Sequence, residues 1–114
     1  MAEQSWKIPR EQIDAIMEQS EFIELDCFGC CTVVVMKLPN GFTLVEKSGT
    51  ISPGEYDPQI GRRICRENLR DKVWELEGYV RKNAYDAYQR SNMSVGGGKT
   101  QEMPVVKPTR AAID

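Results

Sequence analysis

The residues best suited to bind an anion are a row of arginines in the second half of the chain, which consists of Arg62, Arg63, Arg66 and Arg70. Arg62 and Arg66 are four positions apart, which is about one turn of an α-helix, so their guanidinium groups can form a fork for a phosphate. The same row also fits a solvated helix face, on which the arginines pair with Glu67 and Asp71 along the helix. For any single arginine, this second interpretation is favoured.

Three tyrosines follow in the same half of the sequence. Tyr79, Tyr85 and Tyr88 can stack under a nucleotide base, or they can pack in an interface between protein chains. Interface packing is favoured for at least one of them. Since basic and aromatic residues gather here, an anionic ligand is expected to bind to the second half of the chain.

The cysteines do not form a complete metal or redox motif. Cys27 and Cys30 have the two-residue spacing of a zinc knuckle, but a second pair of this kind and any histidine are missing. Cys30 and Cys31 are neighbours on an expected strand, so they cannot easily point at one metal. We interpret the cysteines, including Cys65, as small hydrophobic residues, and expect neither a bound metal nor a disulfide that matters to the fold.

A glycine-rich stretch near the C-terminus resembles only the end of a phosphate-binding P-loop. Residues 96–100 read GGGKT, but the glycine required five positions before Gly98 is replaced by Met93. A P-loop joins a strand to a helix, whereas this stretch leads from a helix into a tail with prolines. A flexible linker is therefore the favoured interpretation.

Composition and charge narrow the class of protein. The chain has 114 residues, of which 40% are hydrophobic and 28% charged, as is typical of one globular domain. Residues 1–57 carry 4 Lys/Arg against 10 Asp/Glu, and residues 58–114 carry 11 against 7. The net charge of −2 is too acidic for a general DNA or RNA binder. Because the chain has no histidine, most hydrolytic mechanisms lose their usual base, and we expect neither enzymatic activity nor a cofactor.

The elements that must position these residues are predicted from hydrophobic periodicity. A short helix is predicted before Ser20, with Pro9 at its first position. Three strands are predicted to follow, over residues 22–28, 32–38 and 42–47. The first alternates between apolar and polar residues, the second is rich in β-branched residues, and the third can pair with the second, so together they predict an antiparallel three-stranded meander. An Asn-Gly turn joins the last two of these strands.

One long helix is predicted to follow the strands. Asp57 can cap its start, Pro58 suits its first turn, and the helical pattern persists to about Arg90. Its apolar stripe, which would pack on the sheet, consists of Gly61, Cys65, Leu69, Val73, Leu76, Val80, Ala84 and Ala87. A helix of about thirty residues outruns a three-stranded sheet, so its second half should protrude. We therefore expect two or more copies to pair through these helices.

The predicted fold class is α+β, with a short N-terminal helix, an antiparallel meander, one long C-terminal helix and an extended tail. Residues 1–90 are expected to form a single domain. Residues 91–114 are expected to be a flexible linker and a tail that closes over a ligand or contacts a partner. No apolar run approaches the roughly 20 residues of a membrane span, and the first residues do not form a signal peptide, so a cytoplasmic location is expected.

Several short motifs lie between about Thr32 and Val80, nearly half of the chain. They are Asn40-Gly41-Phe42-Thr43-Leu44-Val45-Glu46-Lys47-Ser48, Tyr56-Asp57, Ile60-Gly61, Arg66-Glu67-Asn68 and Trp74-Glu75-Leu76-Glu77-Gly78-Tyr79. Together they resemble a family of small phage proteins that includes the Thoeris anti-defence sponge proteins. The Asn-Gly-Phe turn, the Ile-Gly helix start and the Leu-Glu-Gly-aromatic segment make this signature fairly specific.

The resemblance implies a protein that binds and sequesters cyclic nucleotide immune signals without cleaving them. Such sponges hold glycocyclic ADP-ribose between protomers, and some also hold cyclic di- or trinucleotides at a second site. The implied partners are this small molecule and further copies of the chain, in the cytoplasm of an infected host cell. Tyr79 corresponds to the family's helix aromatic and Arg110 to its tail arginine. With the arginine pair described above, the candidate ligand-binding residues are Tyr79, Asn83, Asn92, Thr109, Arg110, Arg62 and Arg66.

Two other functions stay open at this point. The first is a protein–protein inhibitor, whose long helix and tail dock on a host defence enzyme through an exposed apolar patch. The second is a small enzyme that cleaves the signal. Ligand released from the denatured protein separates the three: an intact nucleotide indicates a sponge, an altered one an enzyme, and none an inhibitor.

Overall fold

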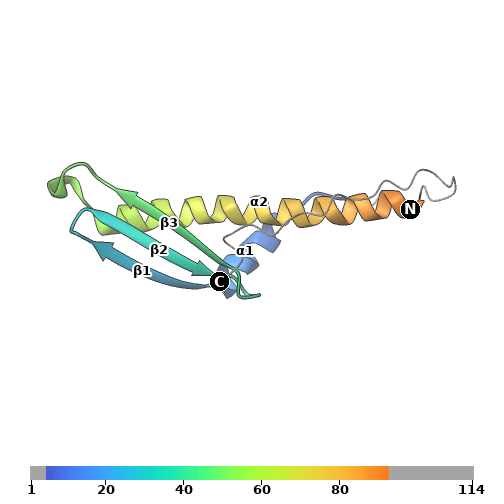
Figure 1. Ribbon diagram of the computed structural model, residues 1–114, viewed down its shortest axis with the longest axis horizontal. Helices are drawn as coiled ribbons and strands as arrows, with labels where there is room; N and C mark the ends of the chain where they lie inside the picture. The colour runs from blue at the N-terminus through green and yellow to red at the C-terminus, as the bar shows by residue number, and fades with distance from the viewer. Residues whose placement is uncertain (1–4, 93–114) are drawn as a thin grey trace, which may run out of the picture.

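The computed structural model describes residues 5–92, which form a two-layer α+β arrangement (Figure 1). Helix α1 (Arg10–Gln19) comes first and is followed by strands β1 (Glu21–Cys27), β2 (Cys31–Lys37) and β3 (Thr43–Gly49). A single 3-10 turn, η1 (Pro53–Glu55), leads into helix α2 (Pro58–Asn92), which has 35 residues. The predicted α+β order of a short helix, three strands and one long helix is confirmed.

The three strands form an antiparallel sheet in the order β1-β2-β3, as the meander predicted. Val35, at the middle of the central strand, pairs with Ile23 on β1 and with Val45 on β3. In the turn between β2 and β3, Gly41 has a φ of 95° and its N–H donates to the Leu38 carbonyl at 2.8 Å. Glycine adopts this left-handed conformation without steric cost, so the Asn-Gly turn sets the register of this hairpin.

Helix α2 begins where the sequence predicts. The carboxylate of Asp57 accepts a hydrogen bond from the backbone N–H of Gln59 at 3.0 Å, and Pro58 is the first helical residue. The side chain thereby satisfies one of the free N–H groups of the first turn. The helix continues to Asn92, two residues beyond the predicted end.

Helix α2 covers one face of the sheet, and the core lies between these two layers. Four members of the predicted apolar stripe, from Gly61 to Val73, are buried against the sheet. Helix α1 closes one end of the core with Ile13. The buried apolar residues are Ile13, Val34, Met36, Leu38, Cys65, Leu69 and Val73.

The second half of α2 extends beyond the sheet, as predicted (Figure 1). Leu76 is half-buried at the edge of the core, but Val80 is 60% exposed, and Ala84 and Ala87 are also exposed. These last members of the predicted stripe do not pack on the sheet, because the sheet ends before them. The protruding half of α2 is therefore free to form other contacts.

Two members of the arginine row, Arg62 and Arg66, pack against the sheet through charges. Arg62 donates to Asp26 at 3.1 Å, and Arg66 donates to Glu24 at 2.9 Å, both across to β1. The expected partners were Glu67 and Asp71, on the helix itself. In the structure, the partners are the acids of β1. The ammonium group of Lys72 pairs in the same way with Glu46 on β3, at 2.6 Å.

Candidate functional site

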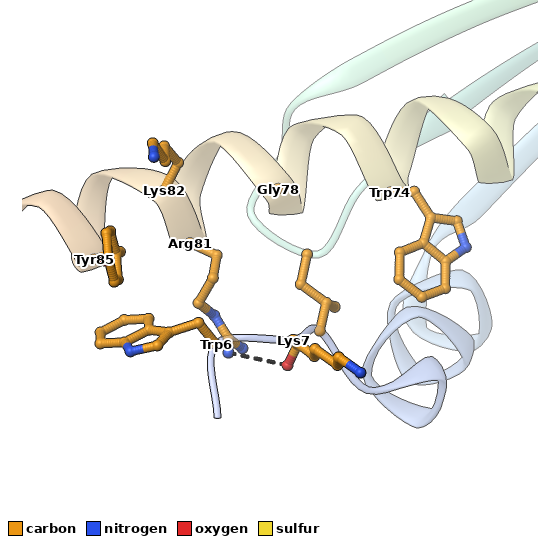
Figure 2. A pocket seen from close by; sticks show the side chains of 8 residues that line it. Trp6, Lys7, Trp74, Gly78, Arg81, Lys82 and Tyr85 are labelled. Atoms are coloured by element: carbon orange, nitrogen blue, oxygen red, sulfur yellow. Dashed lines mark hydrogen bonds between the residues drawn. The ribbon is translucent and has the colours of Figure 1, made fainter. Parts of the chain in front are cut away.

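A cleft of about 680 Å³ lies beside the protruding half of α2 (Figure 2). One wall is the segment that precedes α1, and the other is the face of α2 from Trp74 to Tyr85. Trp6 and Tyr85 lie at one end and Trp74 at the other, with Arg81 and Gly78 between them. The lining residues are Trp6, Lys7, Ile8, Trp74, Gly78, Arg81, Lys82 and Tyr85. The volume is in the range of pockets that bind small molecules and cofactors.

Aromatic contacts hold the N-terminal segment against the helix. The Trp6 ring meets the Tyr85 ring edge to face, with centroids 5.2 Å apart and an interplanar angle of 85°. It also lies 5.5 Å from the ring of Tyr88. Contacts of this geometry contribute about 0.5–1.5 kcal/mol each beyond the area that they bury. Trp6 therefore builds one end of the cleft by holding residues 5–9 alongside α2.

Arg81 is positioned by neutral acceptors. Its guanidinium group donates to the Lys7 carbonyl and to the Gln12 side-chain oxygen, both at 3.3 Å. The amide nitrogen of Gln12 in turn donates to Glu77 at 2.7 Å, which fixes the orientation of the amide. Neutral acceptors orient the guanidinium without cancelling its charge, so Arg81 can still attract an anion.

The cleft is lined by cations, and none of them forms an ion pair within the described residues. Three of the lining residues are cations and none is an acid. Within residues 5–92, no carboxylate lies within 4 Å of the charged groups of Lys7, Arg81 or Lys82. Lys82 lies at the rim, with its ammonium group 5.2 Å from the Tyr85 ring centroid. The cations over the sheet are bound to carboxylates, whereas those of the cleft remain available to a ligand.

Gly78 leaves the surface of α2 bare at the cleft. A Cβ atom at this position would meet no atom within 4 Å, so packing does not require a glycine. Glycine inside a helix costs roughly 0.5–1 kcal/mol relative to alanine. The absence of a side chain here therefore costs stability and opens the cleft.

A second, apolar groove of about 330 Å³ lies where the β2–β3 turn meets α2. Phe42, Tyr79 and Val80 line it and are 54%, 69% and 60% exposed. Tyr79, the aromatic residue that the resemblance assigns to the ligand, belongs to this groove and does not line the basic cleft. Asn83 lies one turn further along α2 and is exposed.

The other predicted site residues lie apart from one another. Arg62 and Arg66 lie over the sheet, and Arg66 is about 20 Å from Tyr79 along the helix axis, given a rise of about 1.5 Å per residue. Asn92 is the last residue of α2. Thr109 and Arg110, like the GGGKT stretch and the rest of the predicted tail, lie outside the described residues. The proposed joint action of Tyr79 and Arg110 stays a prediction.

The basic cleft was not predicted from the sequence. The part of the cleft that lies on α2 could have been found from the sequence. Residues spaced by four, three and four positions share one face of a helix, and this is the spacing of Trp74, Gly78, Arg81 and Tyr85. The part of the cleft that precedes α1 has no such signal in the sequence, since the segment containing Trp6 has no periodicity.

The cysteines lie away from both grooves. Cys27, Cys30 and Cys31 are half-buried around the β1–β2 hairpin, and Cys65 is buried in the core. Burial raises the pKa of the Cys65 thiol. Within residues 5–92, no three Cys, Asp or Glu side chains are grouped so as to hold a metal ion.

The fold and the cleft define a small two-layer α+β protein with a basic, aromatic cleft on one long helix. Residues 8–85 match the phage protein (N4 Gp49/phage Sf6 gene 66) family, and the chain belongs to that family. The match includes all of the helical half of the cleft, while Trp6 and Lys7 precede it. No curated protein and no solved structure matches the chain. Neither helix described is long and apolar enough to cross a bilayer.

Proposed function

We propose that this phage protein binds and sequesters a cyclic nucleotide signal without chemical change, as the sponge proteins that its motifs resemble do. The observation that carries the proposal is the set of cations, without ion-pair partners among the described residues, beside three aromatic rings at a bare stretch of α2. This combination suits a ligand that has both phosphates and flat bases.

Each part of such a ligand has a counterpart in the cleft. Arg81 offers paired N–H donors that match a phosphate, and the ammonium groups of Lys7 and Lys82 add positive charge. The rings of Trp74 and Tyr85 offer faces for a base, and stacking of this kind contributes about 1–3 kcal/mol per base. The cleft volume of about 680 Å³ suits a molecule of nucleotide or dinucleotide size. Glycocyclic ADP-ribose and cyclic di- or trinucleotides are the ligands to test first.

Sequestration would oppose host immunity by lowering the free concentration of the signal in the cytoplasm of the infected cell. A sponge needs affinity and abundance, but it needs no catalytic group. The absence of histidine from the chain agrees with this role, since histidine is the most frequent general base.

A second candidate function is inhibition of a host defence enzyme through the apolar groove. Phe42, Tyr79 and Val80 expose apolar surface together at the β2–β3 turn. Aromatic residues that are exposed in a group commonly serve as anchors in protein–protein interfaces.

Mass spectrometry of small molecules released from the denatured protein tests the function directly. The full chain is incubated with a mixture of glycocyclic ADP-ribose and cyclic oligonucleotides, freed of unbound ligand and then denatured. We expect an intact nucleotide to be recovered. An altered nucleotide would indicate an enzyme, and recovery of none would contradict the proposal and favour the inhibitor.

Calorimetry with two matched variants tests the site. Arg81→Ala removes the central cation of the cleft and should weaken binding about tenfold or more, since a charge-assisted hydrogen bond contributes roughly 1.5–3 kcal/mol. Arg63→Ala removes the same charge from an exposed position at the other end of α2 and should leave the affinity nearly unchanged. Equal losses in both variants would indicate attraction by net charge alone and would place the ligand elsewhere.

A further inference from the structure

The sheet places its apolar side chains on the face that α2 does not cover. In the register of the strands, Ile23, Val35 and Val45 form one row across the outer face, and Leu25 and Val33 belong to the next row. Ile23 is 59%, Val45 53% and Leu25 47% exposed. These five residues, with Glu21 and Lys47 at the margin, are called the outer face below.

The face toward α2 contains the acids instead. Glu24 and Asp26 on β1 and Glu46 on β3 share that face with the buried side of β2, and each is paired with a cation on α2. In a two-layer protein, the sheet face turned to solvent is normally the polar one. Here both faces are apolar at their centre, which is the pattern of a sheet that is covered on both sides.

The outer face carries three charges, because Lys37 lies beside Glu21 at its edge, and two of them, Glu21 and Lys47, make the face complementary to itself. Glu21 begins β1, in the row that contains Lys37 and Thr43, whereas Lys47 is on β3 two rows away. Glu21 and Lys47 thus occupy opposite corners, with Val35 midway between them. Within the described part of the chain, neither has an ion-pair partner. A two-fold axis that passes through Val35 in the plane of the face, perpendicular to the line from Glu21 to Lys47, places each Glu21 against the Lys47 of a second copy.

We propose that the outer face is the contact surface of a homodimer, in which the sheets of two copies pack face to face about this axis. With ordinary strand and residue spacings, this axis crosses the two sets of strands at about 70°, which is closer to the orthogonal mode of sheet packing than to the aligned mode. The interface is isologous, because the same patch serves both protomers. It buries the apolar rows of both sheets. By symmetry, it also forms the ion pair between Glu21 and Lys47 twice.

The area of the outer face sets the expected affinity of the dimer. Three strands of seven residues span about 14 by 23 Å, or about 320 Å² per protomer before side-chain relief. The two protomers together thus contribute about 640 Å², which is below the roughly 1,200–2,000 Å² of stable interfaces, so the dimer should be weak and should dissociate on dilution. This surface differs from the long helices, whose pairing between copies is the expectation from the sequence. The proposal does not depend on nucleotide binding.

Sedimentation velocity of the full chain over a concentration series tests the proposal. We expect a dimer at about 100 µM that dissociates on dilution. Leu25→Lys places a charge in the outer face and should give a monomer throughout. The matched control is Ile60→Lys, because Ile60 is 46% exposed against 47% for Leu25 but lies on α2. Circular dichroism and thermal unfolding verify that both variants are folded.

Charge reversal provides a second test that leaves the apolar rows intact. Glu21→Lys alone and Lys47→Glu alone should each weaken the dimer several-fold, because they place like charges together. The double variant restores the pairing with its sign exchanged, so it should regain most of the wild-type association. A monomeric wild-type chain would overturn the proposal, as would a dimer that Leu25→Lys does not affect. Two single reversals without rescue in the double variant would overturn the proposed two-fold axis.

Discussion

Thr32 on β2 and Gly61 on α2 approach so closely that no side chain fits at position 61 of the helix. A Cβ atom there would overlap the hydroxyl group and the Cβ atom of Thr32. The same hydroxyl group makes a hydrogen bond of 2.5 Å with the phenol of Tyr56, which also donates to Asp26 at 2.9 Å. This close contact sets the distance between the helix and the sheet at the start of α2.

The two glycines inside α2 should respond in opposite directions to the same substitution. Gly61→Ala should lower the free energy of unfolding by about 1–3 kcal/mol, because the new methyl group forces helix and sheet apart. Gly78→Ala should raise it by roughly 0.5–1 kcal/mol, since alanine favours the helix and its Cβ meets no neighbour. Urea unfolding of both variants measures the difference.

The contact with Thr32 can be isolated by a double variant. Thr32→Ala removes the atoms that the new methyl group would strike, so Gly61→Ala should cost much less in that background. An equal cost in both backgrounds would show that the close approach does not limit position 61.

Stability should decrease in alkaline solution because two protons are held more tightly in the folded chain. Burial raises the pKa of the Cys65 thiol above its ordinary value of 9.0. At Tyr56, the hydrogen bond with Thr32 lowers the pKa, but loss of solvent and the Asp26 carboxylate together raise it above 10.0. A raised pKa contributes stability below the unfolded value, and this contribution is lost as the pH rises through the folded value.

Urea unfolding from about pH 8 to about pH 11 tests this prediction. The free energy of unfolding of the wild-type chain should fall over this interval. A variant with both Cys65→Ala and Tyr56→Phe starts from a lower stability, but it should lose less as the pH rises. The same alkaline loss in both proteins would assign the effect to other groups.

The elements of the fold could be predicted because their signals are local. The β-branched run of β2, the Asn-Gly turn and the Asp57-Pro58 helix start each act within a few residues. The α+β class and the start of α2 followed from them.

The orientation of the sheet could not be predicted in the same way. Alternation along β1 separates Ile23 and Leu25 from Glu24 and Asp26, but it does not say which set faces the helix. That choice depends on the arginines of α2, which are distant in the sequence and supply partners for the acids. The cleft was missed for a similar reason, since Trp6 meets α2 only through tertiary contacts with Tyr85 and Tyr88.

A large side chain at position 78 should block nucleotide binding without harming the fold. Gly78→Leu fills the bare surface between Trp74 and Arg81, and leucine is a good helix former. Affinity measured by calorimetry should fall at least tenfold, while the thermal unfolding temperature stays the same or rises. Gly78→Ala adds only a methyl group and should retain most of the binding. Wild-type affinity in Gly78→Leu would show that the ligand does not occupy this cleft.

Trp74 lines the basic cleft and Tyr79 the apolar groove, on different faces of α2. Variants at these two positions therefore distinguish which of the two binds the ligand. If the basic cleft binds the base, Trp74→Ala should weaken binding about tenfold or more, because a stacked base contributes about 1–3 kcal/mol. The resemblance instead predicts that Tyr79→Ala and Arg110→Ala weaken binding, through stacking and through a charge-assisted contact with phosphate. Calorimetry on the three variants, with circular dichroism as the folding control, distinguishes these outcomes. A loss in Tyr79→Ala and Arg110→Ala alone would transfer the site to the groove beside Phe42. A loss in all three would mean that one ligand spans both faces of the helix, which requires a second copy of the chain to complete the site.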